Sequence, residues 1–133
     1  MDPLLTRIFV IDDDDSVRVS LRRLLQAAGY ECVTFESGTA FLQSLQTDSH
    51  ACDTACCAIV DVRMPGIDGI ELTRHLHITH PALRVVLITA SSDEHTKAAS
   101  AALGVVLLSK PFDDVKLFEA VTASGTGAAG APG

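Results

Sequence analysis

Apolar and polar positions follow one another along the chain in blocks, with five short apolar runs separated by longer amphipathic stretches. The runs are rich in β-branched residues and mostly lack the apolar–polar alternation of a half-exposed strand. They span residues 7–11, 31–35, 57–60, 83–88 and 105–108. Strands that are buried on both faces of a parallel sheet have this pattern, which therefore predicts five core strands.

The stretches between the runs place apolar residues at helical spacing. The first apolar stripe stops before Gly29, a residue typical of helix ends, and Ser37 is a candidate N-cap for the second helix. We expect the third helix over 70–79, the fourth over 93–103 and the fifth from 113 to about 122. Five βα units in this order predict an α/β fold, in which helices cover both faces of an open parallel sheet.

Composition and charge narrow the range of functions. A chain of 133 residues, 47% of them apolar, fits one domain, which we place at 1–123, with a Gly/Ala-rich linker or tail at 124–133. The net charge is -7 and basic residues are not clustered, which argues against direct nucleic-acid binding. We see no apolar run of about 18 residues and no signal peptide, so we expect no membrane association and a cytoplasmic location.

The cysteines allow two interpretations. Cys52, Cys56 and Cys57 follow His50 closely, and such a grouping can form a metal or redox site. Their spacing is not that of a CxxC pair, however, and no second ligand cluster follows. We interpret these residues and Cys32 as ordinary reduced thiols, and we expect no structural disulfide.

The residues that follow the apolar runs carry the candidate chemistry. Asp12 and Asp13 follow the first run, and Asp61 follows the third. Thr89 follows the fourth run, and Lys110 lies just beyond the fifth. The carboxyl ends of parallel strands lie along one edge of a sheet, where α/β proteins bind ligands. We therefore expect these five side chains to share one pocket.

This set of groups suits a phosphoryl group and a divalent cation. Three close carboxylates are costly to ionise unless a cation lies among them, and oxygen ligands favour Mg²⁺ or Mn²⁺. Lys110 and Thr89 add an ammonium and a hydroxyl that can bind phosphoryl oxygens. Asp61 can itself act as the nucleophile and form an aspartyl phosphate.

Each of these residues also has a simpler interpretation when it is considered alone. The acidic run at 12–15 precedes a helix, where Asp is a good N-cap and acids favour the helix dipole, so Asp14 or Asp15 is a candidate cap. A single Asp after a strand, such as Asp61, is an ordinary turn residue. Only the joint position at four strand ends points to a shared site.

Four segments around these residues resemble the signatures of response regulator receiver domains. They are 10–14 (VIDDD), 59–69 (IVDVRMPGIDG), 87–90 (LITA) and 108–112 (LSKPF), and the resemblance spans about residues 6–122. The sequences of the second and fourth segments are most similar to those of receivers joined to a LuxR-type helix-turn-helix, as in nitrogen-fixation regulators.

The resemblance implies a flavodoxin-like fold with strand order 2-1-3-4-5 and assigns metal ligands. It implies that Asp13 and Asp61 ligate the metal directly, and that Asp12 acts partly through water. The backbone carbonyl of Arg63 is implied as a further ligand.

The resemblance also implies that Asp61 receives a phosphoryl group from a phosphohistidine of a sensor kinase, while Thr89 and Lys110 contact its oxygens. It implies a phosphoacceptor, not a turnover enzyme, that switches a face made by the fourth helix, fifth strand and fifth helix. That face is a candidate homodimer interface. We further predict a cis peptide between Lys110 and Pro111, which proline makes inexpensive.

Two features depart from the family pattern. Leu107 occupies a position that is usually aromatic, so we expect it to stay packed and to contribute little to switching. The last helix gives way early to the Gly/Ala-rich tail, which suggests either a truncated protein or a domain cut from a longer chain.

Three other functions fit the sequence less well. A phosphatase of the haloacid-dehalogenase type needs an Asp two residues after the nucleophile, where this chain has Arg63. A nucleotide-binding protein is disfavoured because GxxxxGK[ST] and GxGxxG are absent. A phosphorylation-independent dimerisation module would have no need of the five polar residues at the strand ends.

Overall fold

The structure is a computed structural model that describes residues 7–47, 56–91 and 93–129. Strands and helices alternate along the chain as the apolar pattern predicts. The strands are β1 (Arg7–Ile11), β2 (Glu31–Phe35), β3 (Cys56–Asp61), β4 (Arg84–Thr89) and β5 (Val106–Ser109), and the helices are α1 (Asp15–Ala27), α2 (Gly38–Thr47), α3 (Gly69–Thr79), α4 (Glu94–Leu103) and α5 (Asp114–Ala129). Every predicted strand end lies within one residue of the observed end.

The strands form one parallel sheet in the order β2-β1-β3-β4-β5, which confirms the flavodoxin-like topology. The chain builds outward from β1 in one direction to β2 and in the other direction to β3, β4 and β5. The order reverses between β1 and β3, and α/β sheets bind ligands beyond the carboxyl ends of the strands at such a point.

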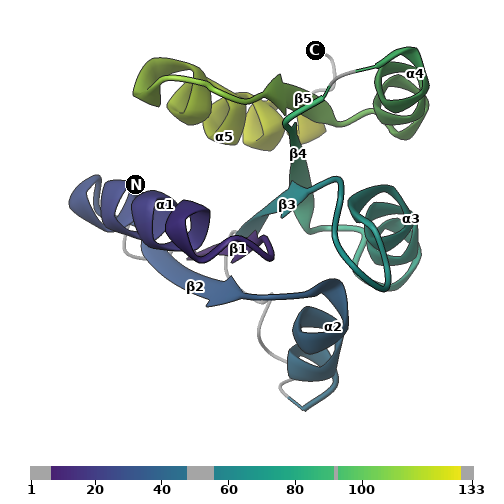
Figure 1. The fold of residues 1–133 in the computed structure, drawn as a ribbon, viewed down its shortest axis with the longest axis horizontal. Helices are drawn as coiled ribbons and strands as arrows, with labels where there is room; N and C mark the ends of the chain where they lie inside the picture. The colour runs from purple at the N-terminus through teal and green to yellow at the C-terminus, as the bar shows by residue number, and fades with distance from the viewer. Residues whose placement is uncertain (1–6, 48–55, 92, 130–133) are drawn as a thin grey trace.

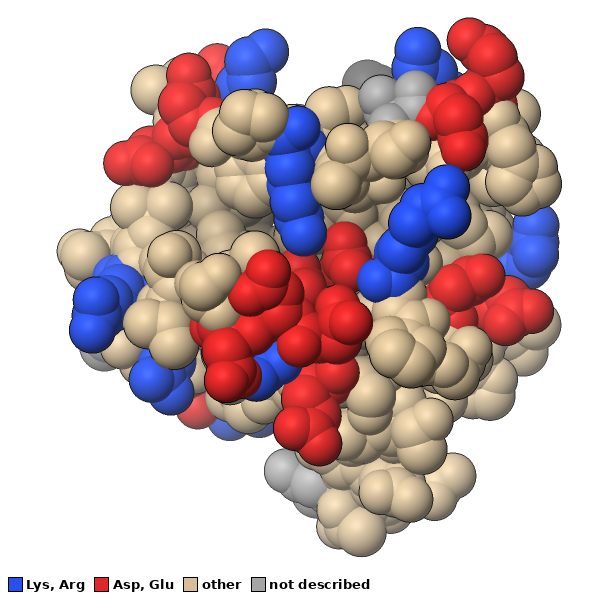
Figure 2. Space-filling model, in the orientation of Figure 1, with Lys and Arg blue, Asp and Glu red and all other residues tan. Residues whose placement is uncertain are grey.

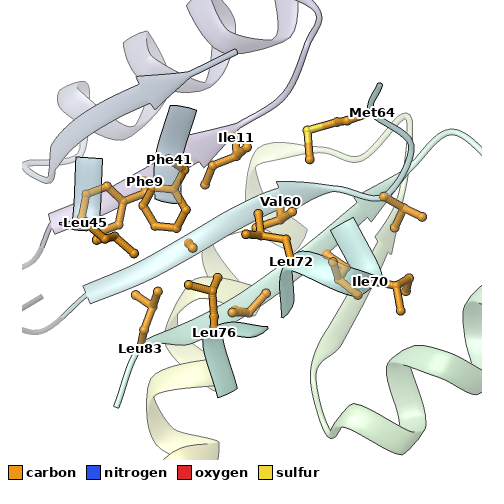
Figure 3. Packing of buried hydrophobic residues seen from close by; sticks show 14 of the residues in the cluster. Phe9, Ile11, Phe41, Leu45, Val60, Met64, Ile70, Leu72, Leu76 and Leu83 are labelled. Carbon is orange, nitrogen blue, oxygen red and sulfur yellow. The ribbon is translucent and has the colours of Figure 1, made fainter. Parts of the chain in front are cut away.

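Helices cover both faces of the sheet, with α1 and α5 on one face and α2, α3 and α4 on the other (Figure 1). Each face has its own apolar cluster. Figure 3 shows the cluster under α2 and α3, where Phe41, Leu72 and Leu76 point toward the strands. Phe41 packs with its ring centroid 5.0 Å from that of Phe9 and 5.2 Å from that of Phe35. This packing holds the strands rigidly beneath the edge where they end.

The helix boundaries mostly follow the predicted capping residues. Asp14 caps α1, and the Ser37 hydroxyl accepts a hydrogen bond from the backbone N–H of Ala40 at 3.1 Å at the start of α2. The predicted end of the last helix near residue 122 is wrong, because α5 continues to Ala129. Ala is the strongest helix former and each Gly costs only about 1 kcal/mol, so the Gly/Ala-rich composition permits the extension. The domain boundary at residue 123 stays a prediction.

Two further predictions concern thiols and membranes. Cys32 is a free thiol, buried in β2, as expected. His50 and Cys52 lie outside the described residues. Within the described part of the chain, no helix combines the length and apolar character that a membrane span requires.

Candidate functional site

Backbone hydrogen bonds continue the sheet beyond its strand ends and hold the site residues in place. The N–H of Asp12 donates to the carbonyl of Phe35 at 3.1 Å. Beyond the ends of β4 and β5, the N–H of Lys110 donates to the carbonyl of Thr89 at 2.7 Å. These bonds place the backbones of Asp12 and Lys110 in register with neighbouring strands, so their side chains start from fixed positions.

The three predicted carboxylates and the predicted ammonium meet at this edge. Asp12, Asp13 and Asp61 each offer a carboxylate oxygen, and these oxygens all lie within 4.8 Å of one another. The Lys110 Nζ lies 3.3 Å from Asp12 Oδ2 and 3.4 Å from Asp61 Oδ1, although Lys110 is 98 and 49 positions away from them in the sequence. Asp12 and Asp61 are buried, whereas Asp13 is exposed.

Burial and charge change the ionisation of this cluster. Burial, followed by the negative charge of Asp12, raises the pKa of Asp61 to about 6, although Lys110 opposes this shift. Burial also works against the charged form of Lys110, but the carboxylates of Asp12 and Asp61 outweigh it and raise the pKa of that ammonium. The cluster therefore has a carboxylate that is easier to protonate than usual beside a firmly protonated lysine.

Gly69 lets α3 approach the phosphoacceptor candidate closely. A Cβ atom at Gly69 would lie 2.4 Å from the carbonyl oxygen of Asp61 and 2.8 Å from the Cα of Val62. The Gly69 N–H donates to the carbonyl of Val62 at 2.8 Å. The start of α3 is thus packed directly against the end of β3, and no larger residue fits there without moving Asp61.

Thr89 is buried at the end of β4, and its hydroxyl is bonded to the loop that follows. The hydroxyl donates to the carbonyl of Ser91 at 3.0 Å and accepts from the Ser91 N–H at 3.1 Å. The structure therefore places Thr89 at the predicted edge, with its hydroxyl committed to the β4–α4 loop.

Arg63 lies at the predicted position after β3, but its side chain turns toward α4. Its Nη2 lies 3.3 Å from Oδ2 of Asp93, the N-cap of α4, and both side chains are largely exposed. The side chain thus links the β3–α3 loop to α4 without joining the carboxylates. The cis peptide predicted between Lys110 and Pro111 is confirmed.

The sequence analysis did not predict the role of Arg18, a basic residue that contacts two residues of the acidic segment 12–15. On α1, Arg18 donates from Nη1 to the backbone carbonyl of Asp12 and pairs through Nη2 with the carboxylate of Asp15. An Arg at the fourth position of a helix that begins with acidic residues is a signal for such a contact. The direction of the Arg18 side chain, however, depends on its torsion angles, which the sequence alone does not determine.

Figure 2 shows acidic side chains gathered near the middle of one face, with basic side chains beside them.

The fold and this site define a class of protein, and comparison with known families identifies it. Residues 8–122 match the response regulator receiver domain family, so the chain belongs to that family. Receivers are phosphoacceptor signalling domains of two-component systems and are not turnover enzymes. The resemblance inferred from the four sequence segments is confirmed.

The similar proteins include transcription regulators. The DNA-binding transcriptional regulator NtrC of Klebsiella pneumoniae is 40% identical over 106 residues, which are 79% of this chain and 22% of that protein. The transcriptional regulatory protein FixJ of Bradyrhizobium diazoefficiens is 38% identical over 111 residues, 83% of this chain and 52% of that protein. The chain thus spans from about a fifth to about half of these relatives.

A solved structure with a similar fold is that of the response regulator TrrA from Thermotoga maritima in complex with Mg²⁺ and BeF. It has a TM-score of 0.75 at 29% identity, and the alignment covers 90% of this chain and 98% of that one.

Proposed function

We propose that this receiver takes a phosphoryl group from the phosphohistidine of a sensor histidine kinase onto Asp61, with Mg²⁺ or Mn²⁺ as cofactor. The observation that carries the proposal is the position of the Lys110 ammonium, within 3.4 Å of both Asp12 and Asp61 at the edge of the sheet. A cation so placed attracts the anionic phosphoryl group toward the carboxylate of Asp61, the last residue of the central strand β3.

Asp61 is the proposed nucleophile. One of its carboxylate oxygens forms a bond to phosphorus while the bond from phosphorus to the donor nitrogen breaks. The freed imidazole nitrogen takes the electron pair and then a proton from water. A pKa of about 6 leaves Asp61 mostly ionised at neutral pH, as a nucleophile must be. Lys110 offsets the charge on the phosphoryl oxygens during this step.

The carboxylates fit a hard divalent cation. Two of the three are buried, and the oxygens lie close enough to share one ion. We propose Asp12, Asp13, Asp61 and the backbone carbonyl of Arg63 as the residues that hold it. When bound, such an ion offsets the charge of the cluster and of the transferred group. The Mg²⁺–BeF complex of TrrA supports this assignment, because that receiver has the same fold.

Thr89 is proposed to bind a phosphoryl oxygen and to carry the signal outward. To reach the site, its hydroxyl must give up both hydrogen bonds to Ser91, which releases the start of the β4–α4 loop. Leu107 packs against the apolar cluster on the α4 side and has no polar tip that water can bind. The response is therefore expected in the β4–α4 loop and on the face of α4, β5 and α5, where we propose that homodimers form.

A groove beside Lys110 suits the docking of the phosphoryl donor. It is lined by apolar residues of α1 and by the β5–α5 connection, including Leu21, Leu24 and Phe112. Because Lys110 also lines this groove, a partner helix bound there would hold its phosphohistidine next to the site. We propose the sensor kinase as that partner, in the cytoplasm, where ATP is available.

The output is proposed to be transcription control. The similar regulators NtrC and FixJ are transcription regulators, and the described chain matches only part of each. The acidic character of this domain argues that DNA contact belongs to another domain and not to the receiver.

A phosphodonor experiment separates this function from its alternatives. The protein is incubated with acetyl phosphate with and without Mg²⁺, and both bound label and released phosphate are measured. A receiver takes about one label per chain, only with the metal, and releases phosphate slowly. Rapid multiple turnover would favour the phosphatase, and no label at any metal concentration would favour a bare dimerisation module.

A further inference from the structure

Arg18 is the feature that the proposed function leaves unexplained. Its side chain is only 15% exposed, which is low for an arginine in the first turn of a helix. The two guanidinium nitrogens reach different parts of the chain, the backbone carbonyl of Asp12 and the carboxylate of Asp15. Arg18 therefore bridges the end of β1 and the first turn of α1.

The bridge acts on the peptide group that joins Asp12 to Asp13. This peptide is planar, so a hydrogen bond to the Asp12 carbonyl limits rotation of the whole unit and the directions of both side chains. Asp12 is held from other sides as well. Its N–H donates to Phe35, and its Oδ1 accepts from the N–H of Asp14 at 2.9 Å. Arg18 supplies the restraint from the α1 side.

We propose that Arg18 is a positioning residue for the cation site. It holds the Asp12–Asp13 peptide in place, raises the affinity for Mg²⁺ and speeds phosphoryl transfer to Asp61, without touching the ion or the phosphoryl group. The inference rests on the proposed function, because it concerns the same site.

Charge and position predict opposite effects for this residue. If Arg18 acts as a nearby positive charge, it repels Mg²⁺, and removing it tightens binding. If it acts as a two-point restraint, removing it weakens binding, and lysine does not replace it because a single ammonium lacks the planar fork. The burial of the side chain and its contact with a backbone carbonyl favour the second role.

The test uses Arg18→Lys, which keeps the charge, and Arg18→Met, which removes it. Arg23→Met is the matched control, since Arg23 is exposed on the same helix. Mg²⁺ affinity is measured by calorimetry at low and high salt, together with the melting temperature without Mg²⁺ and the labelling rate at saturating Mg²⁺. We expect both Arg18 variants to bind Mg²⁺ about tenfold more weakly, as for the loss of one charged hydrogen bond, and the control to match wild type.

Two results would overturn the inference. Tighter Mg²⁺ binding in Arg18→Met, with Arg18→Lys unchanged, would mean that only charge matters. Unchanged affinity in both variants, with a lower melting temperature, would mean that Arg18 only stabilises α1. If Arg18→Met fails to fold, the Mg²⁺ affinity of Arg18→Lys tests the inference by itself, and an affinity equal to that of wild type overturns it. A wild-type protein that neither binds Mg²⁺ nor accepts label would instead overturn the proposed function, and this inference with it.

Discussion

The interior of the sheet and its carboxyl edge are built by the same strands but hold opposite kinds of groups. In the interior, side chains such as Ile8, Ile59 and Val86 are apolar and fully buried. Asp12, four residues beyond Ile8, and Asp61, two residues beyond Ile59, are also buried, with 0% and 6% of their surface exposed. Burial stabilises the apolar interior, whereas the same burial destabilises ionised carboxylates at the edge.

This difference separates stability from function within one sheet. The interior holds the strand ends in fixed positions, and the edge concentrates charge that a bound cation would offset. Changes in the interior should therefore lower stability to the same extent with or without Mg²⁺. Changes at the edge should alter Mg²⁺ binding, and neutralising a carboxylate there should stabilise the metal-free protein.

The largest effect is expected from Phe41→Ala, on α2, because Phe41 packs against the apolar interior of the sheet. Phe41 is fully buried and packs against two other aromatic rings, so truncation should lower the free energy of unfolding by about 3–5 kcal/mol. Denaturant titrations with and without Mg²⁺ should give the same loss. Ile78→Ala is the control, because Ile78 is 81% exposed and its truncation should change little. If the loss of unfolding free energy in Phe41→Ala disappears when Mg²⁺ is added, the proposed separation between the interior and the carboxyl edge is wrong.

Gly69→Ala tests the contact between interior and edge. The added methyl group would meet the backbone of Asp61 and Val62, so we expect a loss of about 1–3 kcal/mol and much slower labelling. Gly104→Ala is the matched control, because Gly104 has φ 71° but no atom lies within 4 Å of the added Cβ. This variant should be less stable, since an alanine is strained at positive φ, but it should be labelled at the wild-type rate. Equal labelling rates in the two variants would contradict this account.

Neutralising the edge should stabilise the metal-free protein in a pH-dependent way. The folded pKa of Asp61, about 6, lies above its ordinary value of 3.8. The associated stability is complete below pH 3.8 and is lost as the pH rises through 6. The free energy of unfolding of Asp61→Asn should therefore exceed that of wild type by about 1–2 kcal/mol at pH 7.5, after allowance for solvent screening. The gain should be smaller at pH 4.5 and nearly absent below pH 3.8. A variant that is less stable at pH 7.5 without Mg²⁺ would argue against charge crowding.

Cys32 provides the smallest effect, and it concerns reactivity. Burial raises the pKa of its thiol to about 11, against the positive charge of Arg22. The thiolate fraction at pH 8 is then about a hundredfold lower than at the ordinary pKa. Mass spectrometry after brief maleimide treatment should find Cys32 unmodified in the native protein and modified in the denatured protein. Rapid native modification would show that this part of the interior opens readily.

The alternation of apolar runs and helical stripes was enough to predict the secondary structure. Runs such as 83–88 are short, mostly apolar and rich in β-branched residues, as strands inside a parallel sheet are, and the strand ends were predicted within one residue. The strand order came from the family resemblance, because run spacing does not determine which strands are neighbours. The meeting of Asp12, Asp61 and Lys110 could be predicted because parallel strands share one carboxyl edge.

Other features were not accessible from the sequence. The continuation of α5 to Ala129 was missed because Gly and Ala suit both flexible linkers and helices. Long side chains were the second difficulty. Arg18 and Arg63 each have several rotatable bonds, and whether they face the acidic cluster or another partner depends on the final packing.

The most direct test of the central claim is the position of the phosphoryl group after treatment with acetyl phosphate and Mg²⁺. Wild-type protein and Asp61→Asn are treated in parallel, and the adduct is mapped by mass spectrometry at a pH that preserves acyl phosphates. The account predicts one label on the peptide that contains Asp61 in wild type, and none in Asp61→Asn. Stoichiometric label on another residue, or full labelling of Asp61→Asn, would contradict it.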